Sequence, residues 1–232
     1  MKLILEHIKK NFDKKEVLLD VDFAFEEGKI YGLLGRNGAG KTTLFNCINE
    51  DLEVDGGRCC IEQEGKIREI RSGDIGYVLA SPVVPEFLTG REFLKFFMDI
   101  HSEKKERFQS PDAYFNLMKI AEEDRDRLMK DYSHGMKNKM QMLVNLVADP
   151  CILLLDEPLT SFDVVVAEEM KNLLKEIKSG HILIFSTHIM ELALDLCDEI
   201  VILNHGILEK IHRENLQSEA LKEKIIQALR EE

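Results

Sequence analysis

The chain has 232 residues, enough for one good-sized domain with an inserted lobe, and its 44% hydrophobic and 32% charged residues are typical of a globular protein rather than a disordered one. A formal net charge of −12 argues against a duplex DNA or RNA partner, because such binding depends on clustered Lys and Arg. The apolar runs are shorter than the roughly 20 residues that cross a bilayer, and no signal-peptide cleavage site follows the amino terminus, so we expect a cytoplasmic protein.

Short apolar runs alternate with helical patterns along the chain. Strands are predicted at 2–8, 29–35, 74–80, 151–156, 181–187 and 199–204, and the later runs are continuously apolar, as strands buried on both faces of a parallel sheet are. Helices are predicted at 41–49, 137–147, 164–178 and 189–196. This alternation predicts an α/β core with a mostly parallel sheet.

Residues 90–131 differ from this core, because they are dense in charge and carry apolar residues at helical spacing. Thr89 and Glu92 fit a capping box at the first helix of this segment. After Gly206 the chain becomes polar and charged, with a helical pattern. We therefore expect one domain over 1–232, with a core from 1–80 and 136–215, a helical lobe at about 81–135 and a charged helical tail at 216–232.

The segment GRNGAGKTT at 35–43, called the phosphate loop below, follows a predicted strand and opens a predicted helix. It matches G-x-x-x-x-G-K-[ST], in which glycines let backbone N–H groups wrap a phosphate at a helix N-terminus. An ordinary Gly-rich turn is the alternative, but the full motif in this context predicts a site for a nucleoside triphosphate. The residues expected to contact the nucleotide are Gly35, Asn37, Gly38, Ala39, Gly40, Lys41, Thr42 and Thr43. Of these, Lys41 would reach the β- and γ-phosphates and Thr42 would ligate Mg²⁺.

The segment CILLLDEP at 151–158 is an apolar strand that ends in two carboxylates. Beside a phosphate loop, Asp156 would hold Mg²⁺ and Glu157 would act as general base on the attacking water, which predicts hydrolysis. A turn with a helix cap is the alternative for a lone acidic pair. His188 follows the next predicted strand, so it should reach the same sheet edge near the γ-phosphate, although a structural histidine is the alternative there.

The order of these motifs along the chain resembles that of the nucleotide-binding subunit of ABC transporters, over nearly the whole chain. The resemblance implies an α/β P-loop NTPase core with a mostly parallel sheet, an antiparallel β portion at the N-terminal side and an inserted helical lobe. GRNGAGKTT is similar to the Walker A loop, ILLLDEP to Walker B with its catalytic glutamate, LTSFD at 159–163 to the D-loop and STH at 186–188 to the switch histidine. The family's signature, most often LSGGQ, is replaced here by YSHGMKNKM at 132–140, which is called the signature segment below. Ser133 and Gly135 match that form, while Tyr132, His134 and Met136 depart from it. The S-x-G-M-K pattern is similar to the branch that serves exporters of drugs, peptides and polysaccharides.

The resemblance implies that two chains, identical or different, pack head to tail around ATP and Mg²⁺. Ser133 and Gly135 of one chain would then contact the ATP held by the phosphate loop of the other, since the start of a helix is a ready anion site. Simple helix capping is the alternative explanation for Ser133. Phe12 stands where the family has an aromatic residue that stacks on adenine, and a core Phe is the alternative there.

The sequence departs from the family pattern after the strand at 74–80. The family usually has a Gln here, which links Mg²⁺ and the attacking water to the helical lobe, and Ala80 stands at that position. Our hypothesis is that Ser81 or a water takes over the oxygen contact. Several apolar residues follow, and they either line a groove for a helix of a membrane subunit or form the core of the lobe: Val83, Val84, Phe87, Leu88, Phe93, Phe96 and Phe97.

The resemblance thus implies an ATPase subunit that powers transport through a separate transmembrane permease, at the inner face of the cell membrane, with export as the expected direction. The alternative is a soluble ABC ATPase that acts on ribosomes, DNA or cofactor assembly. Ribosome-acting members of the family usually carry two cassettes in one chain, and DNA-acting members carry a long coiled-coil insertion, whereas this sequence shows neither. Its acidic charge also disfavours a nucleic-acid partner. A nucleotide kinase is disfavoured because no acceptor site is visible beside the DEP segment.

Overall fold

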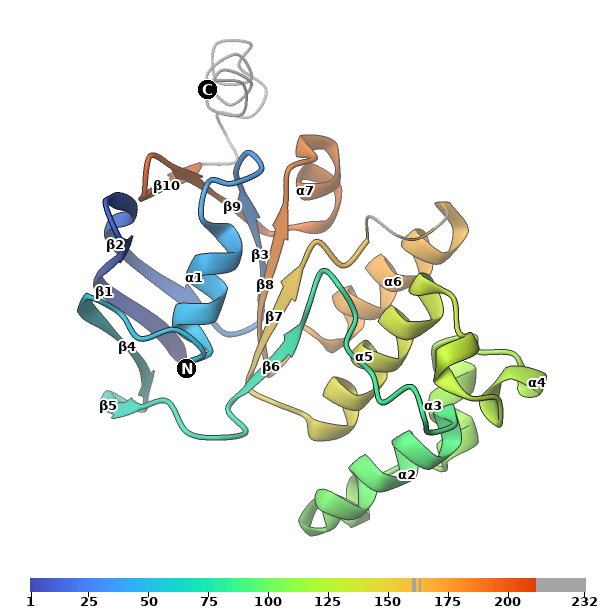
Figure 1. Ribbon diagram of the computed structural model, residues 1–232. Helices are drawn as coiled ribbons and strands as arrows, with labels where there is room; N and C mark the ends of the chain where they lie inside the picture. Colours follow the sequence, from blue (N-terminus) through green and yellow to red (C-terminus); the bar gives the residue numbers. More distant parts are fainter. Residues whose placement is uncertain (160–161, 163, 212–232) are drawn as a thin grey trace.

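The computed structural model describes residues 1–159, 162 and 164–211, which form two sheets and a set of helices (Figure 1). The strands are β1 (Lys2–Phe12), β2 (Lys15–Glu26), β3 (Lys29–Leu34), β4 (Gly56–Gln63), β5 (Lys66–Glu69), β6 (Ile75–Val78), β7 (Ile152–Asp156), β8 (Ile182–Thr187), β9 (Glu199–Asn204) and β10 (Ile207–Ile211). The helices are α1 (Lys41–Ile48), α2 (Gly90–Ile100), α3 (Pro111–Leu117), α4 (Glu122–Arg125), α5 (His134–Ala148), α6 (Val164–Ile177) and α7 (Met190–Leu196), with short 3-10 helices at Ser102–Arg107 and Met129–Asp131.

The larger sheet has the strand order β10-β9-β3-β8-β7-β6. All its neighbouring strands are parallel except β10 and β9, so the carboxyl ends of β3, β7 and β8 lie at one edge. Strands β7 and β8 are buried at every residue, which explains why their sequences are continuously apolar rather than alternating. The predicted α/β fold with a mostly parallel sheet is confirmed.

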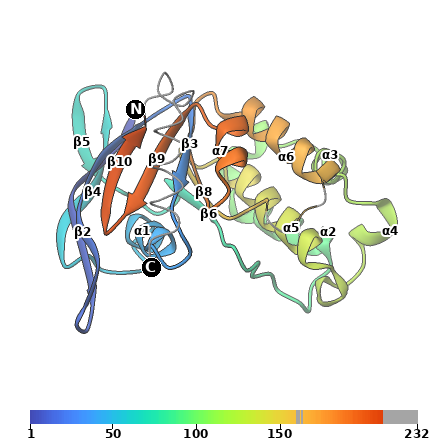
Figure 2. The same ribbon diagram turned by 90° about the horizontal axis from the view of Figure 1, so that it is seen from above.

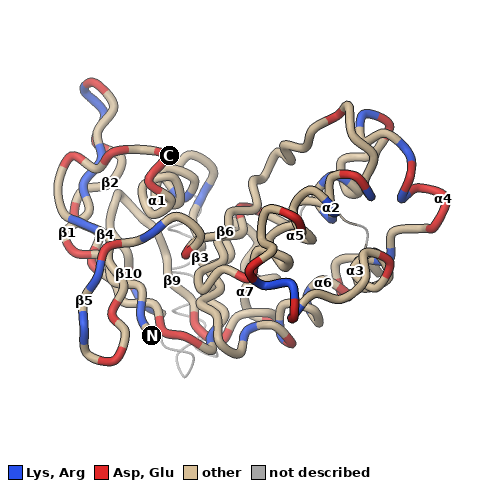
Figure 3. Tube along the Cα trace, turned by 90° about the horizontal axis from the view of Figure 1, so that it is seen from below, with Lys and Arg blue, Asp and Glu red and all other residues tan. Residues whose placement is uncertain are grey.

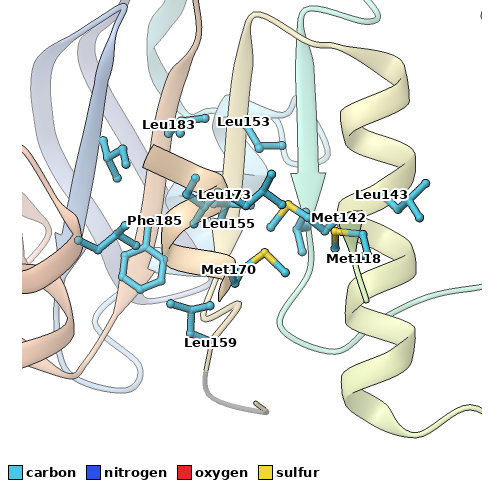
Figure 4. Close-up of a cluster of buried hydrophobic side chains, with 14 of the residues drawn as sticks. Met118, Met142, Leu143, Leu153, Leu155, Leu159, Met170, Leu173, Leu183 and Phe185 are labelled. Atoms are coloured by element: carbon cyan, nitrogen blue, oxygen red, sulfur yellow. The ribbon is translucent and has the colours of Figure 1, made fainter. Parts of the chain in front are cut away.

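Helices cover both faces of this sheet (Figure 2). Successive residues of a strand point to opposite faces, and β7 divides its side chains accordingly. Leu154 packs in one apolar cluster with Phe45 of α1, whereas Leu155 packs in a second cluster with α5 and α6. Figure 4 shows this second cluster, where Met142 of α5 and Met170 of α6 meet the strand side chains.

The smaller sheet is antiparallel, with the order β2-β1-β4-β5, and packs its apolar face on α1 from the side away from β7. It is the antiparallel portion expected at the N-terminal side, although the sequence analysis identified only its first strand. The expectation that the chain turns helical after Gly206 is wrong for Ile207–Ile211, which forms strand β10. His205 and Gly206 have φ values of 45° and 73°, and such a two-residue turn matches the twist of a hairpin. The predicted tail at 216–232 lies outside the described residues.

The helical lobe, α2 to α4, stands beside the core and is joined to it by residues 79–88 and by α5 (Figure 1). The predicted capping box is present, with the Glu92 N–H donating to Thr89 Oγ1 and the Thr89 N–H to the Glu92 carboxylate. Charges of both signs are interspersed over the lobe and the core rather than gathered by sign (Figure 3). No helix in the described ranges combines the length and the apolar character that crossing a membrane requires.

Candidate functional site

The phosphate loop turns sharply between β3, which ends at Leu34, and α1, which begins at Lys41. Gly38 and Gly40 have φ values of +81° and +103°, a left-handed backbone that favours glycine. A Cβ on Gly40 would also lie only 2.9 Å from Val17 Cγ1. Among the residues that the structure describes, no side chain caps the start of α1, so its first N–H groups and the positive end of its dipole are available to an anion.

Lys41 lies folded across this loop, with only 6% of its surface exposed. Its Nζ donates hydrogen bonds to the carbonyl oxygens of Gly35, at 2.7 Å, and Arg36, at 3.1 Å, and lies 3.8 Å from Glu157 Oε1. Burial lowers the pKa of Lys41, and the nearby carboxylates of Glu157 and Asp156 counteract that shift. The ammonium group is therefore held where phosphate oxygens on the loop could replace its carbonyl partners.

Asp156 ends strand β7 and is 2% exposed. The Thr42 hydroxyl donates to its Oδ2 at 2.7 Å, and the Ser186 hydroxyl donates to its Oδ1 at 2.5 Å. Ser186 stands directly opposite Asp156 in the β7–β8 register, so the sheet itself fixes this pairing. A buried carboxylate beside a hydroxyl is a set of hard oxygen donors that suits Mg²⁺, and Thr42 and Asp156 would hold the ion.

Glu157 and His188 follow β7 and β8 and meet at the same edge of the sheet. Glu157 has a φ of +47°, uncommon for this residue type, and its N–H donates to Ser186 Oγ at 3.0 Å. Its Oε1 lies 3.0 Å from His188 Nδ1, so the histidine orients the carboxylate. Ser186 thus holds both acidic residues in place. The sequence analysis did not single out Ser186, although its position two residues before His188 on a parallel neighbour of β7 could have indicated it.

A pocket of about 380 Å³ lies against the phosphate loop and the two carboxylates, whereas His188 is not one of its lining residues. Its lining comprises Phe12, Lys15, Val17, Asn37, Gly38, Gly40, Lys41, Thr42, Thr43, Ala80, Asp156 and Glu157. Gly35 and Ala39 lie in the phosphate loop but do not line the pocket, and Lys15 and Val17 line it without having been predicted. Ser81 is exposed and is not a lining residue, so the pocket geometry favours no role for its hydroxyl.

Phe12 lies at the rim of this pocket, where 44% of its surface is exposed. The alternative of a core Phe is therefore wrong, because a core side chain would be buried. The Lys10 ammonium lies 5.6 Å from the centroid of the Phe12 ring, a distance at which cation–π attraction steadies it.

Ser133 and Gly135 lie away from the pocket, at the start of α5. The Ser133 side chain caps this helix, because its Oγ accepts the Met136 N–H at 3.2 Å. Ser133 remains exposed and Gly135 is half-buried, so an external group can approach this helix start. Of the predicted D-loop, Thr160, Ser161 and Asp163 fall outside the described residues.

The comparisons with known proteins agree with this geometry. Residues 18–160 match the family model described as ABC transporter. The chain is 35% identical over 207 residues to the ABC transporter ATP-binding protein MJ1023 of Methanocaldococcus jannaschii, which covers 88% of this chain and 75% of that protein. It is 32% identical over 211 residues to the sulfate/thiosulfate import ATP-binding protein CysA 2 of Agrobacterium fabrum, covering 89% of this chain and 62% of that protein.

Among solved structures, an ATP-binding subunit of an ABC transporter superposes with a TM-score of 0.85 at 23% identity, covering 100% of both chains. Another is the structure of cbiO1 from Clostridium perfringens, part of the ABC transporter complex cbiONQ, with a TM-score of 0.76 at 23% identity over 97% of this chain and 94% of that one. The chain therefore belongs to the ABC transporter family, as an ATP-binding component, and members of this family hydrolyse ATP.

Proposed function

We propose that this chain is the ATP-hydrolysing subunit that powers transport through a separate transmembrane permease, at the inner face of the cell membrane. The observation that carries the proposal is the meeting of phosphate loop and carboxylates, with Lys41 Nζ 3.8 Å from Glu157 Oε1 in one pocket. A loop that binds phosphates beside a carboxylate able to activate water is the minimal equipment for ATP hydrolysis.

The residues predicted to form the site have distinct roles in this proposal. The N–H groups of the phosphate loop and Lys41 bind the β- and γ-phosphates, and the exposed ring of Phe12 stacks on adenine. Thr42 and Asp156 hold Mg²⁺, which supplies positive charge to the phosphate oxygens. Glu157 accepts a proton from the attacking water, a contribution of about 10²–10⁴-fold in rate, and His188 keeps that carboxylate aimed at the γ-phosphate.

The proposal also requires a second ATPase chain. Ser133 and Gly135 present an exposed helix start outside the pocket of their own chain, so they serve the pocket of another in a head-to-tail pair. Either an identical chain or a related one can occupy that place. The Ser133 hydroxyl that caps α5 has a second lone pair with which to accept a hydrogen bond, and its O–H can donate to a phosphate.

The docking site for the permease is the exposed apolar part of the helical lobe. Of the residues singled out from the sequence, Phe93 is buried at 7% exposure and belongs to the core, and Val84, Leu88 and Phe97 pack against that core. Val83, Phe87 and Phe96 are exposed at 70%, 78% and 55%. Apolar side chains this exposed are suited to a helix of a membrane subunit, since that contact would remove them from water.

Replacing the base tests the catalytic part of the proposal. Glu157→Gln keeps the shape of the side chain but cannot accept a proton, so we expect ATP hydrolysis to fall at least 100-fold and an ATP-bound dimer to accumulate. Size-exclusion chromatography with and without MgATP measures the dimer. The matched control is Glu157→Gln combined with Lys41→Ala, which should remain monomeric because it cannot hold the phosphates. Hydrolysis at the normal rate in Glu157→Gln would refute the assignment.

Direction is the finer part of the proposal, and we propose export on the S-x-G-M-K pattern of the signature segment. The relatives with a named substrate are sulfate/thiosulfate import proteins, and their names describe those proteins. Inverted membrane vesicles that contain the chain and its permease separate the two directions. Export predicts ATP-driven accumulation of substrate inside such vesicles, whereas ATP-driven loss of preloaded substrate would establish import.

A further inference from the structure

Helix α5 packs beside β6 (Figure 1). It carries a row of three amide side chains, Asn138, Gln141 and Asn145. Spacings of three and four residues place them one above the other along the helix. A Cβ on Gly76 of β6 would lie 2.3 Å from Asn145 Oδ1, so this amide touches the strand backbone itself. The row therefore faces β6 and the loop that follows it at 79–88, which is called the pocket loop below.

Gln141 makes the contact with that loop. Its Oε1 accepts the N–H of Leu79 at 3.1 Å, directly after β6 ends at Val78. The side chain is 6% exposed, and its Nε2 has no hydrogen-bond partner among the described residues. A buried amide with an unpaired donor destabilises a fold relative to an apolar side chain of the same size. Stability of this conformation alone therefore does not explain why a glutamine stands here.

The position of Leu79 gives this bond its significance. Leu79 precedes Ala80, the residue through which the loop lines the nucleotide pocket together with Asp156 and Glu157. At its other end, α5 begins at His134, directly after Ser133, whose side chain caps the helix. Ser133 and Gln141 are eight residues apart, so a rigid helical segment of about 12 Å links the helix start to the pocket loop.

Ala80 offers only a methyl group, so the pocket loop has no side chain there that could hydrogen-bond to α5 or to the nucleotide. We propose that Gln141 is the positioning residue that ties the pocket loop to helix α5. When ATP bound to another chain contacts Ser133 at the start of this helix, the position of Ala80 would change with it. The inference rests on the proposed function, because it presumes that another chain's ATP binds at Ser133. The unpaired Nε2 donor gives Gln141 a second bond to make when the helix moves.

Two substitutions separate this role from packing. Gln141→Met keeps the length of the side chain and removes both polar atoms, whereas Gln141→Glu retains an oxygen that can accept the Leu79 N–H. We expect Gln141→Met to lower kcat roughly tenfold, the loss of about one hydrogen bond, with KM for MgATP within about twofold because no pocket residue changes. Gln141→Glu should recover kcat to within about threefold of the unsubstituted chain.

The matched control is Asn138→Leu, one turn earlier on α5. Asn138 is 3% exposed, and neither polar atom of its side chain has a partner in the described ranges. It is equally buried but has no bond to the pocket loop, so kcat should stay unchanged. A fall in kcat equal to that of Gln141→Met would overturn the proposal, because loss of any buried amide would then suffice.

A second readout follows ATP-dependent dimerisation in the Glu157→Gln background. We expect Gln141→Met to raise the MgATP concentration that gives half dimer about tenfold, while Asn138→Leu leaves it unchanged. Unchanged kcat and dimerisation in Gln141→Met, with Glu157→Gln alone still forming the dimer, would overturn only the role of Gln141. Failure of Glu157→Gln itself to trap a dimer would instead refute the proposed function.

Discussion

Two buried polar clusters of this protein differ in how completely they are paired. Asp156 is bonded through both oxygens, by Thr42 and Ser186, at the rigid edge of the parallel sheet. On α5, by contrast, Asn138 and Gln141 leave three buried polar atoms without partners among the described residues. A hydrogen-bond network whose donors and acceptors are all paired fixes one geometry, whereas a network with unpaired groups can still form new bonds. The phosphate side of the site is therefore preorganised, while its connection to α5 is not.

The largest effect on activity is expected at Asp156, whose two carboxylate oxygens both accept hydrogen bonds. Asp156→Asn removes the charge that would hold Mg²⁺ but keeps the fold, because the hydroxyls of Thr42 and Ser186 can each donate or accept. We expect kcat to fall about 10³-fold, with a melting temperature close to that of the unsubstituted chain. ATPase assays over a range of Mg²⁺ concentrations and thermal unfolding check this. Full activity in Asp156→Asn would show that the metal is held elsewhere.

An intermediate effect is expected at Ser186, which links Asp156 and Glu157. Ser186 is fully buried, accepts the Glu157 N–H and donates to Asp156. Ser186→Ala removes the acceptor of the Glu157 N–H and the donor to Asp156 Oδ1, so we expect a loss of roughly 2–4 kcal/mol in the free energy of unfolding, measured by urea denaturation. Thr187→Val, also at a buried position of β8 but without these partners, is the control. Equal losses in the two variants would contradict a special role for Ser186.

The smallest effect, and one of opposite sign, is expected on α5. Asn138→Leu replaces an amide that has no hydrogen-bond partner within 1–159, 162 and 164–211 by an apolar side chain of similar size, so the free energy of unfolding should rise by about 1 kcal/mol. Urea denaturation measures this as a higher midpoint with the same slope. If the variant is destabilised by a comparable amount, Asn138 must make bonds that leave the two clusters equally paired.

Features encoded in a short stretch of sequence were predicted well, whereas features that depend on distant parts of the chain were not. The phosphate loop, the acidic strand end and the strand before His188 are each encoded in fewer than ten consecutive residues, and all lie at one sheet edge as expected. The strands β2, β4, β5 and β10 were missed. They are half-exposed or short, and their placement depends on neighbours far along the chain, as when β1 pairs with both β2 and β4.

The side chains that support the site were harder to predict than those that carry its chemistry. Lys15 and Val17 both stand on β2 and line the pocket, with Val17 against Gly40, and no local pattern marks them. Gln141 lies within the predicted helix at 137–147, and no motif distinguished it from the rest of that helix. Its importance arises from the 3.1 Å bond to Leu79, which is 62 residues away in the chain.

By itself, the sequence determined the α/β class, the phosphate loop and the two carboxylates, because backbone conformation and hydrophobic periodicity are local properties of a chain. Only the tertiary structure decided that Ser186 holds Asp156 and Glu157 together, that Phe12 is exposed at the pocket, and that Gln141 contacts the loop beside Ala80. Such contacts depend on the register of strands and the packing of helices. These are set by the whole core, so no short segment of sequence contains them.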